Sequence, residues 1–155
     1  MKPFSRELQE KLIRIAQREA AKSLLSGDKP FGALLVNGEG VVCFRAHCTQ
    51  LRDSDRIAHA EINLIRKACK KLHCQSLADL VLVINAEPCS MCLSAAIKSG
   101  ITYIYYGARM GQGANPYLLA CDLVKLSRTK ITLYPDILRN ECEAQIAQAR
   151  LQLKN

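Results

Sequence analysis

The sequence predicts an α/β domain in three layers (α/β/α), with a mixed five-stranded sheet between the helices. Five short apolar runs, most of them rich in β-branched residues, are typical of strands: residues 31–36, 41–44, 80–86, 101–106 and 130–134. Helical segments separate the strands after residue 57, which favours parallel pairing through right-handed crossovers. The first two strands are joined by a tight turn and are expected to pair antiparallel.

The N-terminal segment is predicted to be an amphipathic helix. It begins at Ser5 or Pro3, and the run Gly27-Asp28-Lys29-Pro30 ends it. Its apolar residues recur at helical spacing: Leu8, Leu12, Ile15, Ala16 and Leu24. The predicted hairpin follows, with its turn at residues 37–40, and the polar segment 47–55 is expected to be a loop.

The second half alternates helices and strands. Apolar residues at helical spacing predict a helix over residues 58–72. Pro88 suits the first position of the next helix, because its missing N–H would be unpaired there, and Gly100 is a good stop for that helix. The remaining segments are a glycine-rich loop at 107–113, a helix at 117–126 that can cross over to a parallel last strand, and a closing helix at 137–153.

Three side chains of the kind that zinc prefers lie at the starts of two predicted helices: His59, Cys89 and Cys92. The two helix starts are expected to converge, and their partial positive charge favours thiolates. Three protein ligands leave one coordination position open, as in a catalytic zinc site. Glu61 lies two residues after His59 and is close enough to move protons there. The sequence therefore predicts Zn²⁺ as cofactor and Glu61 as the catalytic residue.

Two other interpretations of the same residues remain open. A Cys-x-x-Cys pair that follows a strand and opens a helix is also typical of a thioredoxin-like redox pair. A structural zinc is the second alternative, and it would need a fourth protein ligand. The candidates for that ligand are His47, Cys48, His73 and Cys74.

The composition fits one domain over residues 1–155, with 49% hydrophobic residues and no run long enough for a membrane span. The first residues lack the apolar segment of a signal peptide, so we expect a cytoplasmic protein with reduced cysteines. Four cysteines lie in apolar or helical patterns and are expected to be small core residues: Cys43, Cys69, Cys121 and Cys142.

The formal net charge is +8, which permits a nucleic-acid partner. However, the basic residues are scattered, and the chain has three Phe, five Tyr and no Trp for base stacking. A solvated basic surface is the favoured interpretation, so the charge permits an RNA partner but does not establish one.

The motif His59-Ala60-Glu61 followed by Pro88-Cys89-Ser90-Met91-Cys92 resembles that of the zinc nucleobase deaminases. Over about residues 30–146 the sequence resembles the cytidine deaminase-like superfamily, in the branch of guanine deaminases and tRNA adenosine deaminases. Residues 30–33 look like the guanine deaminases, whereas residues 106–109 and 137–142 look like the tRNA enzymes. The resemblance implies the cytidine deaminase-like fold, a zinc-dependent hydrolase and a homodimer.

The resemblance also implies hydrolytic deamination of a nucleobase or nucleoside. A guanine-like purine is the first substrate hypothesis, tRNA adenosine the second, and a non-catalytic zinc-binding or redox module the third. Members of the branch usually carry a base-reading Asn about eleven residues before the zinc His, where this chain has Cys48. A thiol is a poor hydrogen-bond partner, so His47 or Gln50 takes over or the substrate differs. Candidate substrate-binding residues are His47, Cys48, Ala60 and Glu87.

Overall fold

The computed structural model describes residues 2–74, 76–111 and 118–153. The helices in this part of the chain are α1 (Arg6–Leu25), α2 (Ala60–Leu72), α3 (Ser90–Lys98), α4 (Ala120–Ser127) and α5 (Arg139–Gln152). The strands are β1 (Gly32–Val36), β2 (Val42–His47), β3 (Val81–Ala86), β4 (Tyr103–Ala108) and β5 (Thr132–Tyr134). None of the described helices combines the length and hydrophobicity that crossing a membrane requires.

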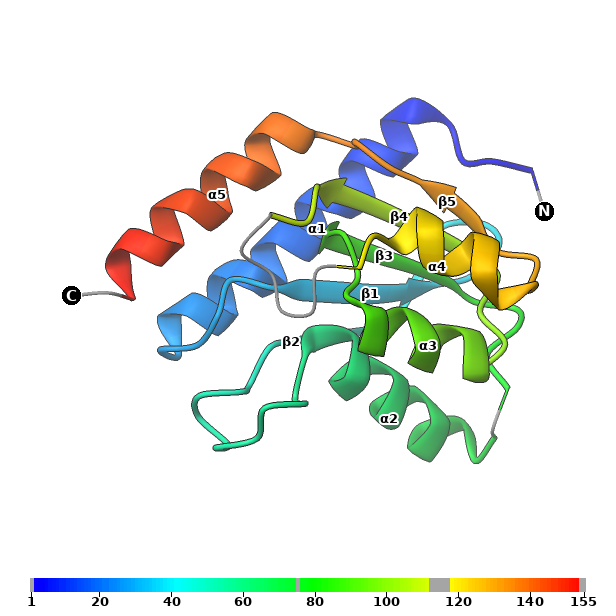
Figure 1. Cartoon of the computed structure of the whole chain (residues 1–155), viewed down its shortest axis with the longest axis horizontal. Coiled ribbons are helices and arrows are strands. Elements are labelled where there is room, and N and C mark those ends of the chain that lie inside the picture. The colour runs from blue at the N-terminus through cyan, green and yellow to red at the C-terminus, as the bar shows by residue number, and fades with distance from the viewer. Residues whose placement is uncertain (1, 75, 112–117, 154–155) are drawn as a thin grey trace.

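The strands form one mixed sheet in the order β2-β1-β3-β4-β5. β1 pairs antiparallel with β2 and β3, whereas β3, β4 and β5 run parallel. Helices α1 and α5 pack on one face of the sheet, and α2, α3 and α4 pack on the other (Figure 1). The predicted three-layer α/β fold, the antiparallel hairpin and the parallel last strand are therefore confirmed.

The central strands are buried on both faces, which explains their nearly continuous apolar sequence. In β1, Ala33 and Leu35 contribute to the core under α2 and α3, while Leu34 and Val36 contribute to the core under α1 and α5. Gly32 begins β1 at a point where the backbone of α1 lies directly against the strand. A Cβ atom there would overlap the Ala16 carbonyl oxygen and the Ala20 nitrogen, so only glycine fits.

Several predicted boundaries were wrong by a few residues. β2 continues to His47, which pairs with Gly32, instead of ending at residue 44. β4 runs two residues later than predicted because it aligns with β3 from the Leu82–Ile104 pair to the Ala86–Ala108 pair. Residues 107 and 108 therefore belong to the sheet and not to the predicted glycine-rich loop. The part of that loop at 112–113 and the predicted helix start at Tyr117 lie outside the described residues.

The helix ends test the predicted start and stop residues. Ser5 is the N-cap of α1, and its hydroxyl accepts a hydrogen bond from the Leu8 backbone, so Ser5 and not Pro3 marks the start. The prediction that Pro88 opens α3 was wrong, since α3 begins at Ser90 with Cys89 as its N-cap. Gly100 follows α3 with φ of 80°, as expected of a stop residue.

The predicted core cysteines are only partly confirmed. Cys142 is buried between α5 and the sheet, and Cys69 is half-buried against the opposite core. Cys121 is also half-buried. Cys43 is exposed, so its prediction as a core residue was wrong. It lies on the edge strand β2, where alternate side chains face solvent.

Candidate metal centre

His59 and Cys89 occupy equivalent places at the starts of two neighbouring helices. Each is the N-cap residue of its helix, α2 for His59 and α3 for Cys89, and each has an extended backbone. N-cap positions usually hold Ser, Thr, Asp or Asn, whose side chains cap the helix. Neither His59 nor Cys89 makes such a capping bond, so both side chains are available to bind another group.

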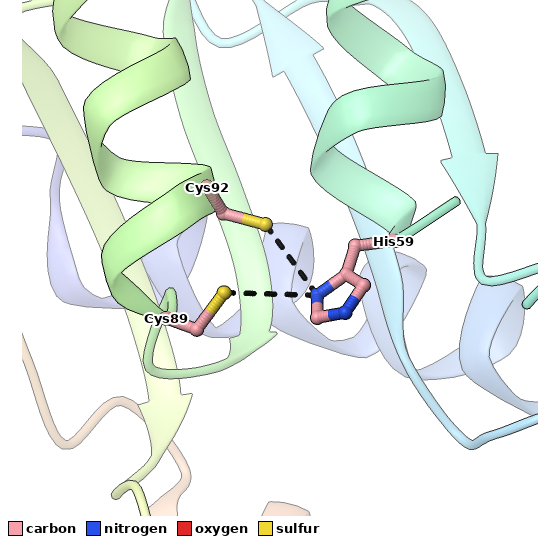
Figure 2. Close-up of side chains that lie close together, drawn as sticks. All are labelled: His59, Cys89 and Cys92. Atoms are coloured by element: carbon pink, nitrogen blue, oxygen red, sulfur yellow. Dashed lines mark hydrogen bonds between the residues drawn. The ribbon is translucent and has the colours of Figure 1, made fainter. Parts of the chain in front are cut away.

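The three predicted ligand side chains converge on one point. Figure 2 shows the Cys89 and Cys92 sulfurs directed at the His59 ring, with Nδ1 lying 3.7 Å from Cys89 Sγ and 3.5 Å from Cys92 Sγ. All three ligand atoms lie within 4.8 Å of one another. A tetrahedral zinc with its usual bond lengths would place nitrogen and sulfur ligands about 3.6 Å apart. The spacing and the chemistry of these donors therefore fit Zn²⁺.

The electrostatics of the cluster favour a thiolate. A hydrogen bond from the Cys92 thiol lowers the pKa of Cys89 to about 4, despite partial burial. The same hydrogen bond, together with burial, raises the pKa of Cys92 well above its ordinary range. The N-termini of α2 and α3 add partial positive charge at this point. The cluster thus stabilises negative charge on sulfur, which is the form that binds zinc.

Glu61 lies in the first turn of α2, beside the cluster but outside the group of three ligand atoms. It is 5% exposed, and burial raises the pKa of its carboxyl. The Cys92 thiol and the His59 ring are among the groups that act on it. A buried carboxyl with a raised pKa holds a proton more readily than an exposed one, which suits a group that transfers protons.

A fourth protein ligand is absent from this cluster among the described residues. His47 faces Glu19, with 3.6 Å between Nδ1 and a carboxylate oxygen. The Cys48 thiol lies 3.4 Å from Asp28 Oδ1, and the Cys74 thiol faces the Ser76 carbonyl. His73 ends α2, whereas His59 precedes its start. The described chain therefore offers an open, three-ligand site.

The segment between His47 and Ala58 is held by Asp28 and Asn63, and the sequence did not predict this role for either residue. The Asp28 carboxylate accepts hydrogen bonds from the backbone of Leu51 and Arg52, both at 3.0 Å. The Asn63 amide, from α2, donates to the carbonyl oxygens of His47 and Ala58 and to the Thr49 hydroxyl. No local pattern marks Asp28 or Asn63, because most of their partners lie 14 or more residues away along the chain.

The four candidate substrate residues occupy different environments. Ala60 is fully buried in the first turn of α2, between His59 and Glu61, and His47 ends β2. Cys48 is fully buried, with its thiol against Asp28. The Glu87 carboxylate accepts hydrogen bonds from the backbone of Met110 and Ala120, so it is already occupied.

Comparisons with known proteins agree with this arrangement. The family model of the cytidine and deoxycytidylate deaminase zinc-binding region matches residues 6–108. The guanine deaminase of Bacillus subtilis is 38% identical over 79 residues, which cover 51% of this chain and 50% of the relative. The tRNA-specific adenosine deaminase of Aquifex aeolicus is 34% identical over 99 residues, which cover 64% of this chain and 65% of the relative. The chain thus spans less than two thirds of each of these relatives.

A solved structure from a study of A-to-I editing by tRNA:A34 deaminases has the same fold, with a TM-score of 0.77 and 29% sequence identity. The superposition covers 87% of this chain and 98% of that one. The similarity therefore extends beyond the metal motif to most of the chain.

Proposed function

The chain belongs to the cytidine and deoxycytidylate deaminase zinc-binding family, and from this premise we propose that it is a zinc-dependent hydrolase that removes an amino group from a nucleobase or nucleoside. One observation carries the proposal. The nitrogen of His59 and the sulfurs of Cys89 and Cys92 converge on one point. The buried carboxyl of Glu61 lies beside them and is not part of that group. A closed structural site would need a fourth ligand, and a redox pair would need neither His59 nor Glu61.

In the proposed mechanism His59, Cys89 and Cys92 hold the metal. When bound, zinc supplies the activation of a water molecule near neutral pH. Glu61 would accept one proton from that water and deliver it to the ring nitrogen, and would then pass the second proton, from the newly attached hydroxyl group, to the leaving amino group. A carbon–oxygen bond forms, the carbon–nitrogen bond breaks, and ammonia leaves with no change in oxidation state. Backbone groups of Cys89 or Cys92, or the carbonyl of Glu87, orient the substrate amine.

The first proposed substrate class is a free guanine-like purine. It is supported by the 38% identity to the guanine deaminase of Bacillus subtilis and by the Pro-Phe-Gly-Ala sequence at residues 30–33.

The second proposed substrate class is adenosine in tRNA, and a basic groove supports it. A cavity of about 490 Å³ lies between the end of α1, β2 and α2. Its charged walls hold four basic and two acidic side chains: Lys22, Arg45, Arg52, Lys67, Glu19 and Asp53. This excess of positive charge adjoins the segment that leads into His59, and it suits a phosphodiester backbone.

One experiment separates these substrate classes. Ammonia release is measured with guanine, adenine, cytosine and their nucleosides, and inosine formation is measured in tRNA at low and moderate salt. The Glu61→Gln variant serves as the blank. Turnover of a free base supports the first class. Inosine formation that falls steeply with salt, without turnover of a free base, supports the second class. Zinc-loaded protein that turns over no member of the panel would contradict the proposed activity.

The groove variant Arg45→Gln/Arg52→Gln sharpens the comparison. It removes two of the four cations, so activity on tRNA should fall while activity on a free base stays unchanged. Lys125→Gln is the matched control, since Lys125 is exposed on α4 and pairs only with Asp122 among the described ion pairs.

A further inference from the structure

Glu87 ties the metal-bearing turn to a distant part of the chain. It lies between β3 and Cys89, and only 7% of it is exposed. One carboxylate oxygen accepts a hydrogen bond from the Met110 backbone at 3.0 Å, and the other accepts one from the Ala120 backbone at 2.9 Å. Met110 follows the end of β4, and Ala120 is the first residue of α4. One side chain therefore holds both ends of the β4–α4 connection.

The backbone of Glu87 reinforces the same link. Its N–H donates to the Ala108 carbonyl at 2.8 Å, so Glu87 contacts the chain at residues 108, 110 and 120. Only a carboxylate offers two acceptor oxygens, one for each backbone N–H. A glutamine would offer one acceptor, and its amide group would face the second N–H as another donor.

The position of this link matters because β3 and β4 are parallel. Their carboxyl ends therefore lie at the same edge of the sheet, where open α/β sheets bind their ligands. The turn that carries Cys89 and Cys92 leaves this edge from β3, and the connection that carries Met110 leaves it from β4. The residues held by Glu87 thus border the edge at which the metal cluster lies.

We infer that Glu87 is a positioning residue whose carboxylate fixes Met110 and the start of α4 against the metal-bearing turn, and so sets one wall of the substrate site. The inference rests on the proposed function for the identity of the bound molecule. The carboxylate acts through the backbone of the connection and not by direct contact with substrate. The alternative is a purely structural cap for α4, which would affect stability without affecting the site.

Glu87→Gln tests the inference, with Glu143→Gln as a matched control. Glu143 also accepts a backbone hydrogen bond, from Arg109, but that bond is longer at 3.5 Å and Glu143 contributes nothing to Met110 or Ala120 in the described contacts. Hydrogen exchange at the amides of residues 110 and 120 reports the link directly. Zinc content shows whether the metal site is intact, and the separate values of KM and kcat show whether substrate binding is altered. Guanine is the substrate in these measurements, or tRNA if only tRNA is turned over.

In Glu87→Gln, exchange at one or both amides should accelerate by about tenfold or more, while exchange in the core of β3 stays unchanged. Zinc should remain at one ion per chain, and KM should rise by about tenfold with kcat changed far less. Glu87→Asp, which retains two acceptor oxygens, should recover part of the loss and serves if the Gln variant does not fold.

Unchanged exchange at both amides would overturn the inference, and so would faster exchange with an unchanged KM, since that result identifies a structural cap. The exchange measurement needs no substrate. The positioning of Met110 and Ala120 is therefore tested even if the protein shows no deaminase activity.

Discussion

The metal cluster and the segment from His47 to Ala58 lie next to each other but are built in different ways. The cluster takes its ligands from two helix starts, where His59 and Cys89 are left free of capping bonds. The neighbouring segment is held by Asp28, which follows α1, and by Asn63 of α2. Both side chains bind the backbone of the segment. In the metal cluster the side chains contact one another, whereas in the segment from His47 to Ala58 the supporting side chains bind mainly the main chain.

This difference separates the chemistry of the protein from its choice of substrate. Substitutions in the cluster should alter metal binding or the rate of reaction. Substitutions in the segment 47–58 should alter stability and the shape of the site, because the polar groups there are already paired. The following predictions test this separation, from the largest expected effect to the smallest.

Replacing a metal ligand should have the largest effect. Cys92→Ala should reduce zinc from about one ion per chain to less than a tenth of that and should lower the melting temperature, since α2 and α3 meet at the metal. Metal analysis and thermal unfolding measure both effects. The control is Cys142→Ala, which removes another buried thiol but should retain zinc at a cost of about 1–2 kcal/mol in stability. Zinc retained by Cys92→Ala would show that Cys92 is not a ligand.

The catalytic carboxyl should affect rate alone. Glu61→Gln should keep one zinc per chain and an unchanged fold, because Glu61 is not among the three converging ligand atoms. The rate should fall by about two to four orders of magnitude, the usual contribution of a positioned acid–base group. Metal content and turnover are measured on the same preparation. Loss of zinc from this variant would instead make Glu61 a ligand.

Asp28 should affect stability without affecting the metal. Burial alone would raise the pKa of this carboxyl, but hydrogen bonds from the backbone of Arg52, Lys29 and Leu51 lower it below its ordinary value of 3.8. Asp28→Asn should therefore cost about 2–3 kcal/mol at pH 7 while zinc stays bound. Because the folded pKa is lowered, this stabilisation is complete above the ordinary pKa and is lost as the pH falls below it.

Denaturant unfolding as a function of pH shows whether the stabilisation by Asp28 is lost on acidification, as predicted. The difference in stability between the natural protein and Asp28→Asn should be constant from pH 7 to about 5 and should shrink below about pH 4. A difference that grows on acidification would mean that Asp28 is protonated in the folded protein.

Cys48→Asn should have the smallest effect on activity. From the sequence alone, installing the family's Asn would be expected to raise activity on purines. The structure changes this expectation, because Cys48 is fully buried and its thiol faces Asp28. An Asn there would donate its amide to Asp28, so kcat/KM should change by less than about threefold, with about 1–3 kcal/mol lost to overpacking. A rise of a decade would place residue 48 inside the substrate site.

The comparison also explains which features the sequence could predict. His59, Cys89 and Cys92 lie in short motifs at helix starts, and local patterns place them correctly. The strands of the central sheet were predicted because their apolar runs are local too. Strand ends were less accurate, as at His47 in β2, because pairing with a neighbouring strand decides where a strand stops.

The roles of the buried polar residues were not predictable in the same way. Asp28 binds residues 51 and 52, and Glu87 binds residues 110 and 120, so each partner is more than 20 positions away. A sequence contains no local pattern for such contacts. The sequence marks Asp28 as part of a helix end and Glu87 as a candidate substrate residue, but it does not predict what their carboxylates bind, because only the folded chain brings those backbone partners into reach.

Zinc X-ray absorption on the purified protein tests the central claim most directly, because it counts the sulfur and the lighter ligands around the metal. The account predicts two sulfur atoms at about 2.3 Å and two nitrogen or oxygen ligands at about 2.0–2.1 Å, one from His59 and one from outside the protein. Three or four sulfur ligands would contradict it by identifying a closed structural site. Folded protein without zinc, in which Cys89 and Cys92 form a disulfide, would contradict it in favour of a redox pair.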